Sequence, residues 1–304
     1  MKNNKKLVMA YLGLFLMTSI IGLSLMFIKI ALNYTNTIDL LAHRFSIAFA
    51  TIMLLWLFNI IKIPKLNKNK LKTLLLLSIS YPSLFFLLQA YGMEYSSVSE
   101  AGIIFATSPI ITLIFAQIFL KEKTTLLQKI GIALSVIGVL YIVLNKGNFS
   151  GNINNLQGIV LLVFSMVAFT CYIILGKRST TKLTAIEITV WITFIACVIF
   201  NLVAFSSHLQ AGKLDQFFAP FGNMDFVWSI LYLGILSSVL TSFLTNYALP
   251  LIPASQMAVL NNLSPILSIL SGVLLLDERL YQYHILGGVF VIIGIVMTLV
   301  FRKR

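Results

Sequence analysis

The stretch ASQMAVLNNLSPILSILSGVLLL, residues 254–276, combines the length of a membrane-spanning helix with several polar side chains. About 20 mostly apolar residues suffice to cross a bilayer as an α-helix. Asn261, Ser264 and Ser268 are spaced by three and four residues, so they share one helical face. Pro265 lies at the middle, where a proline bends a helix. A bent helix with a polar stripe is typical of one that faces protein or water instead of lipid.

The same pattern occurs earlier in the chain, in a register shifted by 156 residues that brings Ser264 onto Ser108. The alignment needs no gap between Tyr91 and Leu144. The chain is therefore predicted to be a duplication, with a first five-helix repeat in residues 1–150 and a second in residues 151–304. The matched pairs are Tyr91 with Tyr247, Ser99 with Ser255, Ser108 with Ser264, Pro109 with Pro265, Glu122 with Glu278, Gly131 with Gly287 and Gly138 with Gly294.

The composition indicates a membrane protein along the whole length. Of the 304 residues, 59% are hydrophobic and only 10% are charged, whereas soluble domains carry about 25% charged residues. Apolar runs of spanning length recur from end to end, so the predicted fold class is an all-α polytopic membrane protein. Ten spans are predicted, at about 7–32, 38–60, 71–91, 98–120, 126–144, 156–176, 184–206, 226–248, 254–276 and 281–301.

The basic side chains predict an orientation. If the N-terminus is cytoplasmic, only Lys146, Lys213 and Arg279 of the 22 Lys and Arg residues fall in outer connections, and Lys29 and Arg44 fall within spans. An excess of basic residues in cytoplasmic loops is the positive-inside rule. Both termini are then cytoplasmic, and the expected location is the cytoplasmic membrane. The rule also explains the net charge of +13 without a nucleic-acid partner, so the expected partners are the lipid bilayer and a small-molecule substrate.

The odd number of spans in each repeat predicts that the two repeats have opposite orientations in the membrane. The loop that carries Glu122 is then cytoplasmic, while the matching loop with Glu278 is external. Inverted repeats of this kind are an architecture of secondary transporters, in which the substrate site lies near the membrane midplane where the repeats meet. The sequence therefore predicts ten transmembrane helices arranged as two inverted five-helix repeats.

Several of these features resemble the EamA-type transporters of the drug/metabolite transporter superfamily. They are the ten inverted spans, the mid-span Ser-Pro pairs, the motif AspGluArgLeu at 277–280 before Gly287 and Gly294, and Arg44 near the start of the second span. The resemblance covers essentially the whole chain. It implies a transporter that moves a small metabolite, an amino acid or related compound for example, with export as the expected direction.

Polar residues on the third, fourth, eighth and ninth spans are predicted to line a substrate cavity. Ser and Thr also serve helix packing in membranes, because small side chains let helices approach closely, and this alternative stays open for each of them. Amide side chains favour a cavity, since they need several hydrogen-bond partners. The candidate cavity residues are Arg44, Tyr81, Gln89, Tyr91, Ser108, Tyr172, Trp191, Thr241, Asn246, Asn261, Asn262 and Ser264, with helix kinks at Pro82, Pro109 and Pro265.

Arg44 is placed within the second span, about two helical turns from the outer end. A charged side chain at such a depth is costly and marks a candidate functional site. From the sequence, Arg44 either binds a substrate carboxylate through parallel N–H groups or pairs with Glu100 or Glu187. The neighbouring His43 points to another face of the helix and is expected to be a core or interfacial histidine.

Two function classes are compatible with these residues. The first is a secondary transporter that works by alternating access, and a homodimer is left open. The second is a membrane-embedded enzyme or lipid-handling protein, for which only His43, Arg44 and Glu100 could begin a polar cluster. The sequence has no P-loop, HExxH or Ser/His/Asp set, so no cofactor, metal or catalytic residue is expected. Glu122 and Glu278 are expected to cap the next helix or to pair with a basic neighbour.

Overall fold

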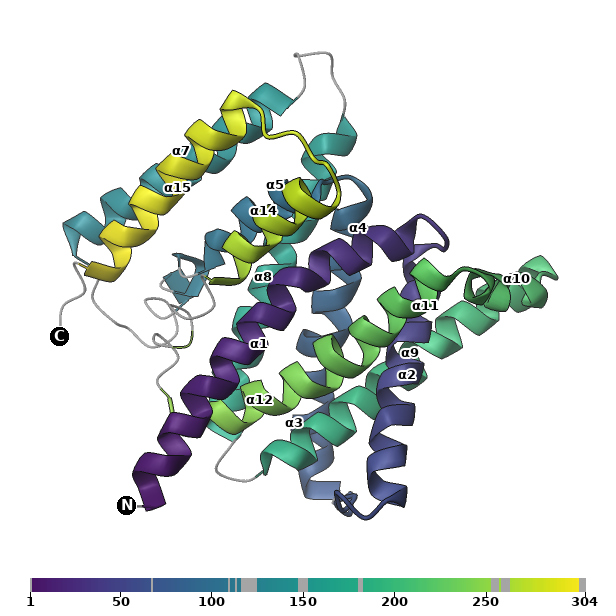
Figure 1. Ribbon diagram of the computed structural model, residues 1–304. Coiled ribbons are helices and arrows are strands. Elements are labelled where there is room, and N and C mark those ends of the chain that lie inside the picture. The colour runs from purple at the N-terminus through teal and green to yellow at the C-terminus, as the bar shows by residue number, and fades with distance from the viewer. Residues whose placement is uncertain are drawn as a thin grey trace.

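The computed structural model describes residues 2–66, 68–108, 110–112, 114–115, 125–146, 153–179, 183–252, 257 and 263–300 (Figure 1). Within these ranges the regular elements are helices and no strand occurs, which agrees with the predicted all-α class. The elements are α1 (Lys2–Leu32), α2 (Thr37–Leu57), α3 (Lys68–Ser78), η1 (Ile79–Leu84), α4 (Phe85–Glu94), α5 (Val98–Ala106), α7 (Leu126–Lys146), α8 (Ile153–Ser179), α9 (Ala185–Ala211), α10 (Leu214–Phe218), η2 (Ala219–Gly222), α11 (Met224–Leu231), η3 (Tyr232–Leu240), α12 (Thr241–Ala248), α14 (Leu263–Leu275) and α15 (Gln282–Val300).

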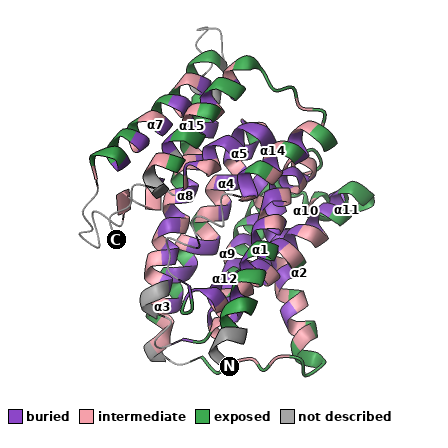
Figure 2. Cartoon of the chain, turned by 60° about the vertical axis from the view of Figure 1, so that its left-hand side comes forward, coloured by how far each residue is buried: buried purple, intermediate pink, exposed green. Residues whose placement is uncertain are grey.

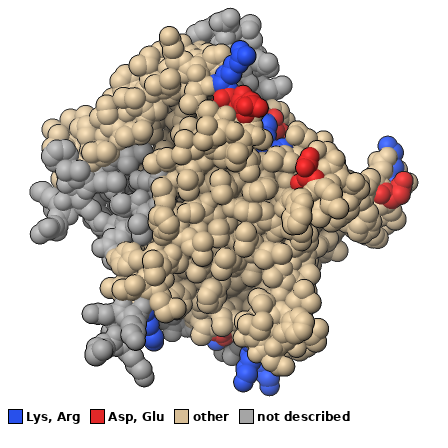
Figure 3. Space-filling model, viewed as in Figure 1, with Lys and Arg blue, Asp and Glu red and all other residues tan. Residues whose placement is uncertain are grey.

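Among the described residues, six helical segments are long and apolar enough to cross a membrane. Shorter apolar helices lie where the other four spans are predicted, so the number ten stays a prediction. Side chains on outward faces are large and apolar, such as Leu12, Leu202 and Ile292, which are 65%, 66% and 58% exposed. On the face shown in Figure 3, the charged side chains lie towards the edges and leave a broad uncharged middle. A multi-pass membrane protein has this distribution. The six segments are Lys6–Leu32, Thr37–Leu57, Lys70–Glu94, Leu156–Gly176, Ala185–Ala211 and Met224–Ala248.

The helix starts follow from local sequence signals. The side-chain oxygen of Asn36 accepts a backbone hydrogen bond at the start of α2. α5 and α9 begin with capping boxes, formed by Ser97 with Glu100 and by Thr184 with Glu187. Such boxes satisfy N–H groups that the first turn of a helix leaves without partners. Glu100 and Glu187 therefore lie at helix starts, each with a local structural role.

Glycines set the packing of the last helix of each half. α7 and α15 lie side by side (Figure 1). A Cβ atom added at Gly138 would lie 2.6 Å from the carbonyl oxygen of Gly287, and one at Gly287 would lie 2.8 Å from the carbonyl oxygen of Gly138. Gly294 makes a similarly close approach to the backbone of Gly131. The two backbones can meet because no side chain separates them, as is common between membrane helices.

The core of the molecule surrounds α1, which packs against α12, α14 and η3 and also contacts α4 and α5. Gly22 allows the close approach of α1 to α14, since a Cβ atom there would lie 2.8 Å from the carbonyl oxygen of Ser264. Buried residues gather on the faces of these helices that point towards one another (Figure 2). The helices around α1 therefore form the interior, while one face of α7 and α15 is left exposed.

Two spans depart from regular α-helical winding near their middle. In η1 the backbone of Tyr81 has φ −147° and ψ 126°, outside the helical range, and Pro82 follows it. η3 also has the wider π-helical winding, and its range 232–240 corresponds to 76–84 in the predicted repeat register. Wider turns of this kind are frequent at functional sites. η1 packs against α4 and α8, and η3 packs against α1 and α12.

Candidate substrate pocket

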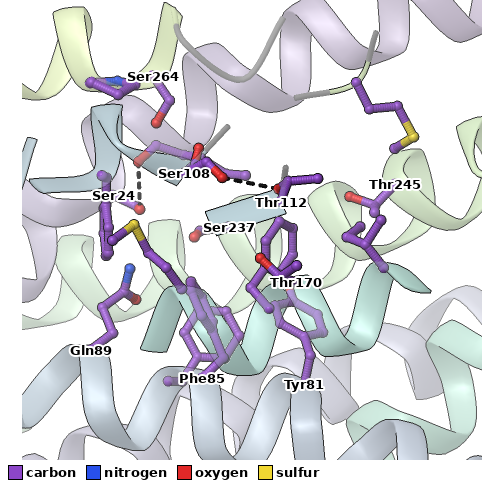
Figure 4. A pocket seen from close by; sticks show the side chains of 18 residues that line it. Ser24, Tyr81, Phe85, Gln89, Ser108, Thr112, Thr170, Ser237, Thr245 and Ser264 are labelled. Carbon is purple, nitrogen blue, oxygen red and sulfur yellow. Dashed lines mark hydrogen bonds between the residues drawn. The ribbon is translucent and has the colours of Figure 1, made fainter. Parts of the chain in front are cut away.

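A cavity of about 100 Å³ lies between these helices (Figure 4). Among the described residues, the same number of lining residues comes from each side of the predicted repeat boundary near residue 150. The first half supplies Ile21, Ser24, Tyr81, Phe85, Phe86, Gln89, Phe105, Ser108 and Thr112, and the second half supplies Met166, Phe169, Thr170, Ile173, Ser237, Thr245, Met257, Ser264 and Pro265.

The described lining is aromatic and aliphatic, with hydroxyl groups and one amide, and contains no charged side chain. Gln89 is 2% exposed, and its Oε1 atom has no hydrogen-bond partner among the described residues. A buried amide without a partner carries a free-energy cost. In Figure 4 Gln89 lies beside the open space together with Phe85 and Tyr81. This polar group is therefore available to a bound molecule or to water.

Arg44 lies directly behind the pocket wall and is fully buried. Its Nε donates to Oγ of Ser238 at 2.8 Å, and one terminal nitrogen, Nη2, donates to Oγ of Ser237 at 2.9 Å. The guanidinium carbon stands 3.8 Å from the ring centre of Phe86, a cation–π contact. The other terminal nitrogen, Nη1, has no partner among the described residues. Ser237 and Phe86 both line the pocket, so they separate the guanidinium from it.

The two acids proposed as partners of Arg44 are engaged elsewhere. Glu187 forms an ion pair with Lys70, with 2.6 Å between Oε1 and Nζ. Glu100 completes its capping box, and its Oε1 lies 3.3 Å from Nε2 of His284. Of the two alternatives for Arg44, pairing with Glu100 or Glu187 is therefore wrong, because both carboxylates bind other residues and Arg44 binds Ser237 and Ser238.

Three further candidates form a polar layer behind the wall. The hydroxyl of Tyr172 donates to Oδ1 of Asn246 at 2.5 Å, and Nδ2 of Asn246 donates to the hydroxyl of Thr189 at 3.1 Å. Thr241 donates to the backbone oxygen of Ser237 at 2.6 Å. These side chains are buried, and each has a protein partner. They hold the helices that carry the pocket and do not line it.

The other predicted residues divide into those that reach the cavity and those that do not. Trp191 packs edge-on against Phe194 and is absent from the lining, as is the half-buried Tyr91. Pro82 lies in the interrupted segment η1. Asn261, Asn262 and Pro109 lie outside the residues that the structure describes. Of the predicted cavity residues, Tyr81, Gln89, Ser108 and Ser264 line the cavity. Pro265, which was predicted as a helix kink, also lines it.

Several lining residues were not predicted. Phe85 lies midway between Tyr81 and Gln89, at the helical spacing i, i+4, i+8, and this pattern could have revealed it. Ser24 and Thr170 also reach the cavity. Each is an isolated hydroxyl residue within an apolar run, and no sequence signal separates it from the other Ser and Thr residues that serve packing.

Glu278 joins the two halves of the chain next to the helices that form the cavity. Its carboxylate accepts hydrogen bonds from the backbone N–H groups of Val98 at 2.7 Å and Ser99 at 2.8 Å, and from the Ser99 hydroxyl at 2.7 Å. A carboxylate at a helix start is favoured by the free N–H groups and by the helix dipole. The sequence predicted that Glu278 caps the following helix or pairs with a basic neighbour. The structure shows instead that Glu278 caps α5, 180 residues earlier.

Lys29 binds the end of the helix that precedes α5. Its Nζ donates to the carbonyl oxygens of Met93 and Ser96, both at 2.9 Å. A cation at the C-terminal end of a helix binds carbonyl groups that have no intrahelical donor. Lys29 and Glu278 thus hold the two sides of the short connection between α4 and α5, and through it they hold helices that carry pocket residues.

These features together define a multi-pass α-helical membrane protein with a central pocket shared by its two halves. The chain belongs to the EamA-like transporter family, whose profile matches twice, at residues 8–144 and 156–300. The uncharacterized transporter YcxC of Bacillus subtilis is 41% identical over 287 residues, which cover 94% of this chain and 91% of YcxC.

More distant relatives agree with this assignment. An uncharacterized transporter of Archaeoglobus fulgidus is 28% identical over 286 residues, with 93% of this chain and 95% of the relative covered. One crystal structure superimposes with a TM-score of 0.62 over 93% of this chain and 97% of its own, at 13% identity, and so shows the same fold. The chain is therefore a membrane transporter by family, with a fold that a solved structure shares.

Proposed function

We propose that the protein is a secondary transporter that carries a small metabolite through the central pocket by alternating access. The observation that carries this proposal is that both halves contribute equally to the described part of the pocket lining. In transporters built from repeats, the substrate site lies where the repeats meet, and movement of one repeat against the other changes its access. The polar groups of interrupted helices serve such sites.

Contacts between the halves support the proposed inverted repeat. Gly138 meets Gly287, and Gly131 meets Gly294. Adding the repeat shift of 156 to Gly138 gives Gly294, and adding it to Gly131 gives Gly287. Exchanging the two halves therefore converts the Gly138–Gly287 contact into the Gly131–Gly294 contact, as a two-fold axis between the halves requires. The two family matches and the equivalent positions of η1 and η3 agree with ten spans in two five-helix repeats.

The proposed orientation places both termini in the cytoplasm, and its support is the distribution of Lys and Arg over the predicted connections. Export is the proposed direction, and it rests on the family resemblance. A homodimer is compatible with the broad apolar outer surface.

The alternative of an enzyme or lipid-handling protein is disfavoured by the positions of its three candidate residues. His43 is 3% exposed, and its Nε2 lies 2.8 Å from the carbonyl oxygen of Phe217. Glu100 belongs to the start of α5, and Arg44 contacts Ser237 and Ser238. The three side chains therefore have separate partners and do not form one polar cluster.

A pocket-filling variant tests the proposed transport route. Thr170 lines the cavity, so Thr170→Phe places a ring in the space that a substrate needs. Ser206→Phe adds the same ring on an exposed face of α9 and is the matched control. Intracellular and extracellular metabolite pools are compared among cells with wild-type protein, either variant or none. We expect at least one metabolite to be redistributed by wild type and the control but not by Thr170→Phe. Equal pools in wild-type and gene-free cells would reject the proposal.

A metabolite found in this way is then tested with purified protein. Proteoliposomes that contain wild-type protein should exchange the labelled metabolite for unlabelled metabolite, whereas those with Thr170→Phe should not. Exchange without added nucleotide distinguishes a secondary transporter from a pump driven by ATP.

A further inference from the structure

Arg44 has no acidic counter-ion in the part of the chain that the structure describes. The sequence has 9 acidic residues, and all except Glu122 are described. The partners of Arg44 are serine oxygens and aromatic rings. A permanently charged guanidinium that is fully buried in a membrane protein is normally paired with an opposite charge. Because no described acid pairs with Arg44, a bound molecule could supply the opposite charge.

Ser237 and Phe86 contact the guanidinium of Arg44 and also line the pocket. Oγ of Ser237 accepts a hydrogen bond from Arg44, so the hydroxyl proton of Ser237 is left to donate to another acceptor. Phe86 also lines the pocket, and the centre of its ring lies 3.8 Å from the guanidinium carbon. The interior has a low effective dielectric constant, which strengthens electrostatic attraction over one layer of side chains. A bound anion would therefore be stabilised at this wall.

The other lining residues favour some ligands over others by charge and by shape. No Asp or Glu is present among the described lining residues, so an ammonium group would enter the pocket without a carboxylate partner. Gln89 offers an amide oxygen without a partner, and either this oxygen or the NH₂ group can be turned to the pocket. The rings of Phe85, Phe105 and Phe169 provide a surface for an apolar body.

We propose that the pocket takes a small amphipathic organic anion, such as an aromatic monocarboxylate, and rejects cations and aromatic amino acids. The carboxylate lies at Ser237 and Gln89, where Arg44 supplies the charge, and the apolar body lies against the phenylalanine rings. The inference rests on the proposed transport function, because it assigns the substrate class of the same pocket.

Binding to the purified full-length protein in lipid nanodiscs tests the charge selectivity with four probes of similar size. They are phenylacetate, its neutral isostere phenylacetamide, the cation 2-phenylethylammonium and the zwitterion phenylalanine. We expect wild type to bind phenylacetate at least 10-fold more tightly than phenylacetamide, since each tenfold corresponds to only about 1.4 kcal/mol. The cation should bind most weakly. Binding of phenylacetamide or phenylalanine as tight as that of phenylacetate would overturn the proposal.

Variants then test whether Arg44 is the source of the selectivity. Arg44→Gln removes the charge but keeps an amide that can bond to Ser237 and Ser238, and it should reduce the preference for phenylacetate to within about 2-fold. Arg279→Gln removes an exposed charge after α14 and should retain the full preference. An unchanged preference in Arg44→Gln would overturn the role of Arg44.

Two variants cover the case in which Arg44→Gln does not fold. Arg44→Lys retains the charge and should retain part of the preference, while Ser237→Ala removes the hydroxyl between charge and pocket and should lower it. Equal selectivity in wild type and Ser237→Ala would contradict the proposed position of the carboxylate.

The experiments can reject the proposed transport function and the proposed substrate class independently of each other. Selective phenylacetate binding without a change in the metabolite pools rejects transport and retains the anion site. Redistribution of a cationic or zwitterionic metabolite, with none of the four probes bound, retains transport and rejects the proposed anion.

Discussion

Glu278→Gln is expected to loosen the start of α5. The variant keeps the size of the side chain but removes the charge that accepts hydrogen bonds from Val98 and from the backbone and hydroxyl of Ser99. Hydrogen bonds to a charged group contribute about 1.5–3 kcal/mol and neutral ones about 0.5–1.5 kcal/mol, so each of the three bonds weakens by about 1 kcal/mol. The NH₂ group of glutamine also cannot accept from a donor. The expected loss is about 3 kcal/mol.

Hydrogen–deuterium exchange measures this loss locally. If exchange requires opening of the α5 start, about 3 kcal/mol corresponds to roughly 100-fold faster exchange of amides near Val98 and Ser99. Asp277→Asn is the matched control, because it neutralises the adjacent exposed acid, and its backbone φ of 52° suits asparagine as well. Acceleration should be confined to Glu278→Gln. Wild-type exchange at the start of α5 in that variant would refute the reasoning.

Three further predictions concern packing, the polar layer and orientation. Gly287→Ala should lower the stability in detergent by about 1–3 kcal/mol, since its Cβ would lie 2.8 Å from a carbonyl oxygen of α7. Gly288→Ala is the control and should be neutral, because no described atom lies within 4 Å of the added Cβ. Equal unfolding temperatures of the two variants would contradict the close contact. Tyr172→Phe should lower the free energy of unfolding by about 1–2 kcal/mol, because it removes the hydrogen-bond donor to Asn246. The affinity for phenylacetate should not change. An altered affinity would place Tyr172 in the binding surface. In whole cells an impermeant thiol reagent should label a cysteine at Gln216 but not at Lys65, and the reverse result would invert the proposed topology.

The broad architecture was predictable from the sequence because lipid imposes strong constraints. Helices must satisfy their backbone groups internally and must be long and apolar enough to cross the bilayer. These rules act on each segment separately, so they can be applied without knowledge of the fold. The glycines of α7 and α15 were matched in the repeat register, but the contact between them was not predicted, because it depends on how the two helices pack.

The site was less predictable because its residues are selected by contacts between distant segments. The chain contains 23 Phe residues, so nothing in composition singles out Phe86 or Phe169 as pocket walls. Arg44 was recognised, but the sequence left open whether it binds a substrate or an acidic side chain, because the partners of Glu100 and Glu187 depend on how distant segments pack. Glu278 could be assigned a capping role, whereas its partner helix depends on how α14 packs against α5.

The glycine contacts between α7 and α15 also bear on the history of the chain. A homodimer with C2 symmetry has an isologous interface, in which residue i of one subunit meets residue j of the other and j meets i. The pairs Gly138–Gly287 and Gly131–Gly294 have this form in the repeat register. Under the proposed duplication, the seam has the geometry that two separate five-helix subunits would share before their genes were fused. Fusion then keeps the two partners at a fixed ratio and frees each half to acquire its own pocket residues. Arg44 illustrates this freedom, because α9, the second helix of the other half, contains neither Lys nor Arg.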